Sequence, residues 1–196
     1  MITSINPDNP QQRLIDRVCE TLDRGGLIAY PTDTFYGIGC DLYNKKGVQR
    51  IHQLKNRPLK KPFSIICDSL KGISKYAKVS DYAYKTMRRL LPGPYTFILE
   101  GTKLVPKIML TKRKTVGIRV PDNNICLAIV ETLGRPIIST SAIHEDPYSI
   151  KDAYASSLDI IIDGGALHPE PSSVISLIDD YPEVIREGKG DISSFL

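Results

Sequence analysis

The segment Lys55-Asn56-Arg57-Pro58-Leu59-Lys60-Lys61-Pro62 places four cations within seven residues, directly before the apolar run Phe63-Ser64-Ile65-Ile66-Cys67. Proline fixes φ and has no N–H, so a helix cannot continue through this segment. The sequence therefore predicts a constrained basic loop that leads into a strand. Such a loop can bind a polyanion, for example a triphosphate or a nucleic-acid backbone. The alternative interpretation is a solvated basic connector.

Helices and strands alternate on both sides of this loop. Apolar stripes predict helices at residues 10–24, 44–54, 69–76, 80–91, 122–133 and 150–157, with Asn9, Asn44 and Ser80 as N-caps. Apolar or alternating runs predict strands at 27–30, 63–67, 95–100, 115–120, 136–141, 158–162, 173–178 and 184–186. The short turn at 179–182 predicts antiparallel pairing of the last two strands. We therefore expect a layered α/β (α+β) fold with a mixed sheet, as one domain over residues 10–190 with no second domain.

Net charge is unevenly distributed along the chain. Residues 1–120 carry 22 Lys and Arg against 9 Asp and Glu, giving +13, whereas residues 121–196 carry 4 against 13, giving −9, and together they give +4. This asymmetry predicts that a polyanion faces the first part of the chain. It does not distinguish a nucleotide from a nucleic acid.

Several protein classes are excluded by what the sequence lacks. It has no run of about 18 apolar residues, and residues 1–7 have neither the basic nor the apolar region of a signal peptide. Four cysteines are widely spaced without a C-x-x-C motif: Cys19, Cys40, Cys67 and Cys126. This spacing favours reduced thiols over a disulfide framework or a zinc site. We expect a cytoplasmic protein without a membrane span.

A nucleotide site in this chain must be built from side chains. Neither G-x-x-x-x-G-K-[ST] nor G-x-G-x-x-G is present, since Gly37-Ile38-Gly39 lacks the third glycine. The candidate ligands are cations at strand or loop ends: Lys55, Arg57, Lys61, Arg119 and Arg186. Each alone is typical of a surface cation. Several of them on one face would indicate an anion site, because like charges repel unless an anion holds them.

Two further segments carry potentially reactive groups. Ser139-Thr140-Ser141 lacks a G-x-S-x-G context and a base partner, which favours hydrogen bonding to a substrate over covalent catalysis. The alternative is that these hydroxyls only satisfy the strand end. His144-Glu145-Asp146 offers one imidazole and two carboxylates on a loop, a pattern typical of solvated residues. We therefore expect no metal site.

Several segments together resemble the YrdC-type threonylcarbamoyl-AMP synthase family. They occur in family order: YPTDTFYGIGCD (30–41), KNRP (55–58), PGPYT (92–96), VGIRVP (116–121) and STSA (139–142). Residues 101–103, 112–115 and 186–191 most resemble the YciO branch. The resemblance implies a YrdC/RibB-like three-layer fold, with a twisted mixed sheet of about seven strands around a positively charged cavity.

The resemblance also implies a nucleotidyltransferase. L-threonine, bicarbonate and ATP with its Mg²⁺ would give threonylcarbamoyl-AMP and pyrophosphate, for the N6-threonylcarbamoyladenosine modification of tRNA. The residues carried over for ATP are Lys55, Arg57, Lys61, Thr115, Ser141 and Arg186, of which Lys55, Arg57 and Ser141 would act in catalysis. Those carried over for threonine are Thr32, Thr34, Arg119 and Ser172. The reaction needs no covalent protein nucleophile.

Two positions depart from the family pattern. The family's S-x-N reads Ser141-Ala142-Ile143, so an aliphatic side chain replaces an amide. Ile65-Ile66-Cys67 stands where synthases usually carry a His after the basic loop. Both departures suit the YciO branch. The alternative hypothesis is therefore a non-catalytic protein that binds a nucleotide, or binds tRNA or double-stranded RNA through basic segments 55–61, 85–89 and 103–114.

Overall fold

The computed structural model describes residues 1–144, 146–154 and 156–195. Within this part, ten strands form one sheet: β1 (Ile2–Ser4), β2 (Ile28–Tyr30), β3 (Gly37–Gly39), β4 (Ser64–Ile66), β5 (Tyr95–Glu100), β6 (Thr115–Arg119), β7 (Ile137–Ser141), β8 (Ile160–Asp163), β9 (Ser173–Ser176) and β10 (Glu183–Arg186). The α-helices are α1 (Gln12–Asp23), α2 (Lys45–Leu54), α3 (Leu70–Tyr76), α4 (Asp81–Leu90), α5 (Asn124–Leu133) and α6 (Pro147–Tyr154).

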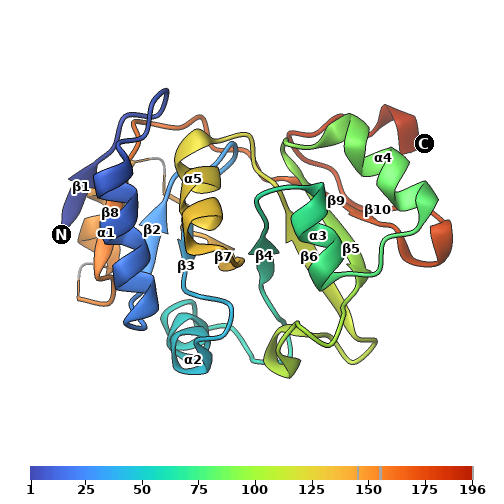
Figure 1. Ribbon diagram of the computed structural model, residues 1–196, viewed down its shortest axis with the longest axis horizontal. Helices are drawn as coiled ribbons and strands as arrows, with labels where there is room; N and C mark the ends of the chain where they lie inside the picture. The colour runs from blue at the N-terminus through green and yellow to red at the C-terminus, as the bar shows by residue number, and fades with distance from the viewer. Residues whose placement is uncertain (145, 155, 196) are drawn as a thin grey trace.

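The sheet is mixed, as the sequence predicts. Its strand order is β1-β8-β2-β3-β7-β4-β6-β5-β9-β10 (Figure 1). Four neighbouring pairs are parallel, namely β1/β8, β2/β8, β4/β6 and β5/β9, and the other pairs are antiparallel. The expected antiparallel pairing of the last two strands is confirmed, with Glu183 opposite Ser176.

The expected number of about seven strands is wrong, because the described residues form ten. The apolar pattern misses β1, which is only three residues long, and β3, whose two glycines are typical of a loop. Gly39 lies so close to the neighbouring strand that an added Cβ would stand 2.1 Å from the carbonyl oxygen of Ile138. Glycine is therefore required there for β3 to fit between β2 and β7.

Two of the three expected helix caps are confirmed. The side chain of Asn44 accepts the N–H of Gly47 at 2.9 Å, and that of Ser80 accepts the N–H of Ala83 at 3.1 Å. The expected cap at Asn9 is wrong, because α1 follows Gln11 without a side-chain cap. The expected helix at 150–157 is α6, which begins and ends three residues earlier, and Ala155 lies outside the described residues.

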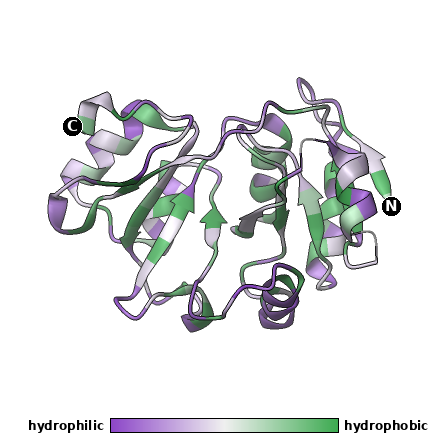
Figure 2. Ribbon diagram, turned by 180° about the vertical axis from the view of Figure 1, so that it is seen from behind, coloured by the Kyte–Doolittle hydropathy of each residue, from purple (hydrophilic) through white to green (hydrophobic). Residues whose placement is uncertain are grey.

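Two apolar cores lie on opposite faces of the sheet and make three layers. One core joins α1 and α5, which lie side by side in Figure 1, to residues such as Ile28 and Ile160. The other joins α2, α3, α4 and α6 to the alternate strand positions, including Ile65 and Ile118. Apolar residues appear as green bands along the strand arrows in Figure 2. In the described residues, no helix is long and apolar enough to cross a membrane.

Candidate functional site

A cavity of about 1080 Å³ occupies the part of the sheet that α1 and α5 leave uncovered. Strands β7, β4, β6 and β5 contribute its floor through small or hydroxyl side chains such as Ser139, Ser64, Gly117 and Thr96, and β9 contributes Val174, with Ser172 directly before that strand. These residues alternate with the buried apolar ones on the opposite face. The loops at the strand ends supply the walls.

The cavity lining is strongly cationic. Six cations line it, namely Lys55, Arg57, Lys60, Lys61, Arg119 and Arg186, and none of its described lining residues is Asp or Glu. Among described residues, only Arg119 of these six forms an ion pair. Cations held together without carboxylates repel one another unless an anion enters, so the cavity fits an anionic ligand of several charges.

Eight of the ten residues expected to form the site line this one cavity. They are Lys55, Arg57, Lys61, Thr115, Arg119, Ser141, Ser172 and Arg186. Thr32 and Thr34 do not line it. Both are buried beside it, with their hydroxyl oxygens 3.1 Å apart, and the oxygen of Thr34 accepts a hydrogen bond from Arg119 at 3.0 Å.

Arg119 is buried and already paired before any ligand enters. Its Nη2 donates to Oδ1 of Asp33 at 2.6 Å, and Oδ2 of Asp33 accepts the N–H of Asp122 at 3.0 Å. The Nε of Arg119 is buried without a partner in the described residues. A buried donor without an acceptor is costly, so this nitrogen is suited to a ligand oxygen.

Arg57 closes the basic loop on itself. Its Nε donates to the carbonyl of Lys61 at 3.0 Å and its Nη2 to that of Pro62 at 3.2 Å, while the guanidinium lies 5.1 Å from the ring centroid of Phe63. Burial lowers the pKa of Arg57. Beneath the loop, Nδ1 of His52 lies 3.0 Å from the carbonyl oxygen of Arg57. The loop is therefore ordered by its own side chains.

Lys55 is held by a residue that the sequence motifs do not indicate. Its Nζ donates to the hydroxyl of Tyr154 at 3.3 Å and lies 5.5 Å from the centroid of that ring. The ring of His144 meets Tyr154 edge-on at 5.6 Å. Tyr154 thus joins the basic loop to the segment that follows β7, although it is 99 positions from Lys55 in the chain.

Arg186 approaches the cavity from β10. Its Nε and Nη2 donate to the carbonyl of Ser172 at 3.1 and 2.7 Å, and the hydroxyl of Ser172 lies 2.8 Å from that of Thr96. Burial lowers the pKa of Arg186, and the positive charge of Arg119 lowers it further. Two guanidinium groups therefore face the same end of the cavity, and only one has a carboxylate partner in the described residues.

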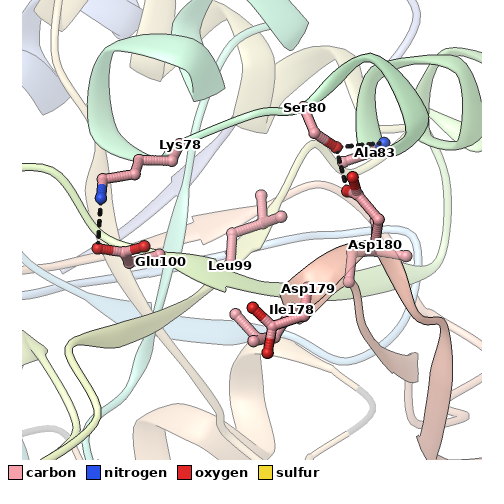
Figure 3. A pocket seen from close by; sticks show the side chains of 9 residues that line it. Lys78, Ser80, Ala83, Leu99, Glu100, Ile178, Asp179 and Asp180 are labelled. Carbon is pink, nitrogen blue, oxygen red and sulfur yellow. Dashed lines mark hydrogen bonds and ion pairs between the residues drawn. The ribbon is translucent and has the colours of Figure 1, made fainter.

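Among the residues that the structure describes, the other titratable groups do not form a second reactive site. A smaller hollow of about 150 Å³ contains the ion pair of Lys78 with Glu100 at 2.6 Å and the hydrogen bond of Ser80 to Asp180, so its carboxylates are largely occupied (Figure 3). The four cysteines are buried and free, and burial raises the pKa of Cys19 to about 11. No group of three metal-ligating side chains occurs in the described residues, and Glu145 of the His144-Glu145-Asp146 segment lies outside them.

The fold and the cavity define an α/β protein with a large cationic site, and comparison with known proteins identifies its family. A family model named Sua5/YciO/YrdC and described as telomere recombination matches residues 20–188. YciO of Escherichia coli (strain K12) is 45% identical over 200 residues, covering 98% of this chain and 97% of that protein. The crystal structure of E. coli YciO superposes with a TM-score of 0.96 at 44% identity, covering 100% of this chain and 99% of that one. The chain belongs to the Sua5/YciO/YrdC family.

More distant members carry an enzyme name. A putative threonylcarbamoyl-AMP synthase of Methanocaldococcus jannaschii is 32% identical over 190 residues, covering 92% of this chain and 88% of that protein. Sua5 from P. abyssi, solved in complex with L-threonine, has a TM-score of 0.88 at 28% identity and covers 96% of this chain. This chain matches only 57% of that longer protein.

Proposed function

We propose that the protein is a nucleotidyltransferase of the threonylcarbamoyl-AMP synthase type, with ATP, L-threonine and bicarbonate as substrates. The observation that carries the proposal is the cavity of about 1080 Å³ with six lining cations and no described lining carboxylate, in a chain of this family. ATP supplies the clustered negative charge that such a lining needs. The L-threonine found in P. abyssi Sua5 supports the choice of amino acid.

The proposed reaction has two steps. The deprotonated amine of threonine attacks the carbon of bicarbonate, water leaves, and a carbamate forms. A carbamate oxygen then attacks the α-phosphorus of ATP, and the bond from this phosphorus to the bridging oxygen breaks to release pyrophosphate. Such a transfer depends on orientation and on cations at the phosphoryl oxygens. It needs no covalent protein nucleophile, in keeping with the absence of an activated thiol among the four buried cysteines.

The ten residues expected to form the site have the following roles in this proposal. Lys55, Arg57, Lys61 and Arg186 neutralise the triphosphate and the leaving pyrophosphate, while the hydroxyls of Thr115 and Ser141 donate hydrogen bonds to the nucleotide. At the end of the cavity that Arg186 also faces, Arg119 offers its unpartnered Nε to the threonine carboxylate, and Ser172 lies there as a hydrogen-bond partner of Arg186. Thr34 accepts a hydrogen bond from Arg119, and Thr32 contacts Thr34, so these two threonines hold Arg119 in place and do not touch the ligand.

Magnesium belongs to the substrate in this scheme. The described cavity lining has no carboxylate that could ligate it, so Mg²⁺ would enter on the phosphates and keep its other ligands as water, which it releases reluctantly. The product would serve the N6-threonylcarbamoyladenosine modification of tRNA, and the protein would act in the cytoplasm.

Direct detection of the acyl adenylate tests the proposal. Purified protein is incubated with L-threonine, bicarbonate, Mg-ATP and pyrophosphatase, and threonylcarbamoyl-AMP is measured by mass spectrometry. Product that depends on threonine and on bicarbonate is the expected result, and reactions with serine or glycine test whether another amino acid is preferred. Absence of any carbamoyl adenylate, together with absence of nucleotide binding, would overturn the proposal.

One observation favours RNA binding as a second candidate function. Thr111 and Thr115 line the cavity, and the exposed cations Lys112, Arg113 and Lys114 lie between them in sequence, so positive charge continues from the cavity onto the rim. A basic rim of this kind fits the phosphates of tRNA or double-stranded RNA. Changing Lys112 and Lys114 to Glu should weaken RNA binding and reduce its salt dependence; unchanged binding would remove this candidate.

A further inference from the structure

The backbone of Ile143 has a conformation that its side chain opposes. Its φ is +64°, in the left-handed region where β-branched residues are genuine outliers. The side chain is 71% exposed, so burial does little to offset this strain. Asn or Gly would adopt this left-handed conformation with less strain. Strained residues of this kind cluster at functional sites, where the side chain has a use that outweighs its conformational cost.

The position of Ile143 is fixed by the strand before it. Ala142 is buried, and its N–H donates to the carbonyl of Tyr36 at 2.7 Å. The β3/β7 register pairs Gly37 with Ser141, so Phe35 and Ile143 each lie two residues beyond that pair, at the same end of the two strands. Both Phe35 and Ile143 line the cavity. They therefore form an apolar corner in a lining that is otherwise rich in cations and hydroxyls.

This apolar corner lies near Lys55. The residue after Ile143 is His144, whose ring packs on Tyr154, and Tyr154 holds the ammonium of Lys55 at 3.3 Å. A ligand with a phosphate on Lys55 thus has an aromatic and an aliphatic side chain close to the phosphate site. In a nucleotide, the base and its sugar are the parts that can pack against these apolar side chains.

We propose that Phe35 and Ile143 form a slot that holds the nucleobase by its faces, an inference that rests on the proposed function. Every nucleobase has an apolar face, so contact of this kind tolerates different bases. An amide in place of Ile143 could read the polar edge of a base, whereas an aliphatic side chain cannot. The slot therefore predicts that Mg-ATP and Mg-GTP bind with affinities within about tenfold of each other.

The substitution Ile143→Asn separates strain from ligand contact. Calorimetry measures binding of Mg-ATP, Mg-GTP and inorganic triphosphate, and thermal denaturation measures stability. We expect the variant to melt roughly 2–4 °C higher because the left-handed strain is relieved, and to bind one of the two nucleotides about fivefold or more weakly than the other, because its amide can read the edge of the base. Affinity for inorganic triphosphate, which has no base, should change less than twofold.

Two further variants support the comparison. Ile185→Asn makes the same substitution at a half-exposed position of β10 that does not line the cavity, and it should neither raise the melting temperature nor weaken nucleotide binding. Phe35→Ala removes the other wall and should selectively weaken nucleotides about tenfold, as loss of a stacked aromatic ring does.

The possible results distinguish this inference from the proposed function. Unchanged nucleotide affinity in Ile143→Asn, equal weakening of inorganic triphosphate, or wild-type ATP binding no tighter than inorganic triphosphate each overturns the slot while leaving the phosphate site intact. Failure of the wild-type protein to bind ATP or triphosphate at all overturns the proposed function, and the slot with it.

Discussion

Nη2 of Arg119 lies 2.6 Å from Oδ1 of Asp33, and the two side chains are only 9% and 8% exposed. This buried pair divides the cavity by charge. The carboxylate of Asp33 neutralises the charge of Arg119, whereas the other five lining cations have no carboxylate partner in the described part of the chain. The negative charge of a ligand is therefore expected at the Lys55 to Lys61 loop and at Arg186, and a single carboxylate at Arg119.

Removing the charge of Asp33 should destabilise the protein. In Asp33→Asn the guanidinium of Arg119 stays buried without its counterion, which typically costs about 3–5 kcal/mol. Urea denaturation should show this loss. The control Glu20→Gln breaks an exposed pair with Arg24 at 3.7 Å and should leave the midpoint almost unchanged. Similar midpoints for the two variants would contradict the importance of the buried pair.

Arg57→Lys should weaken triphosphate binding about tenfold while hardly changing stability. Lysine cannot donate to the carbonyls of Lys61 and Pro62 together or lie flat on Phe63, so the basic loop loses its order although its charge is kept. Calorimetry with inorganic triphosphate measures the effect. Arg89→Lys, an exposed change on α4, is the matched control. Equal affinity in both variants would show that charge alone matters.

Protonation of His52 should reduce stability as the pH falls. Burial lowers its pKa from the ordinary 6.5, and its Nδ1–H donates to a carbonyl while Nε2 is buried without a partner in the described residues. The unfolded chain thus takes up a proton near pH 6.5 before the folded chain does. Stability is full above this pH and is lost as the pH falls toward the lowered pKa.

Urea denaturation at pH 7.5 and 5.5 tests the role of His52. The wild-type protein should lose more unfolding free energy between these two values than His52→Gln does, because the variant has no imidazole to titrate. An equal loss in both proteins would assign the pH dependence to other groups.

Tyr154→Phe should weaken triphosphate binding about threefold to tenfold. The change removes the hydroxyl that Lys55 donates to at 3.3 Å but keeps the ring, so the ammonium becomes freer without loss of packing. Calorimetry measures the affinity. Tyr148→Phe, at a largely exposed position of the same helix, is the control and should bind as the wild type does. If Tyr154→Phe bound inorganic triphosphate with wild-type affinity, the hydroxyl of Tyr154 would not be needed to position Lys55.

Patterns within short stretches of sequence predicted much of the fold. The predictions that failed depend on contacts with residues outside those stretches. Asn44 and Ser80 cap their helices because capping depends on residues three positions away. At Asn9 a competing turn prevailed, because the N–H of Asn9 donates to the side chain of Asn6. Strand β3 could not be found from composition, since Gly39 is selected by its close contact with β7.

The same distinction applies to the site. The cations at loop and strand ends were identifiable from their motifs, and the fold brings them to one cavity. The partners that orient them were not identifiable, because Asp33 and Tyr154 lie 86 and 99 positions from the side chains they hold. The left-handed conformation of Ile143, two residues beyond the end of β7, has no signal in the sequence.

Calorimetric titration of Mg-ATP into the wild-type protein, Lys55→Ala and Lys78→Ala tests the cationic cavity most directly. Lys78 is an exposed cation paired with Glu100 outside this cavity, so its loss controls for a change in net charge. We expect wild-type binding that weakens with salt, at least tenfold weaker binding in Lys55→Ala, and wild-type affinity in Lys78→Ala. No binding by the wild-type protein, or equal affinity in all three, would contradict a nucleotide site in this cavity.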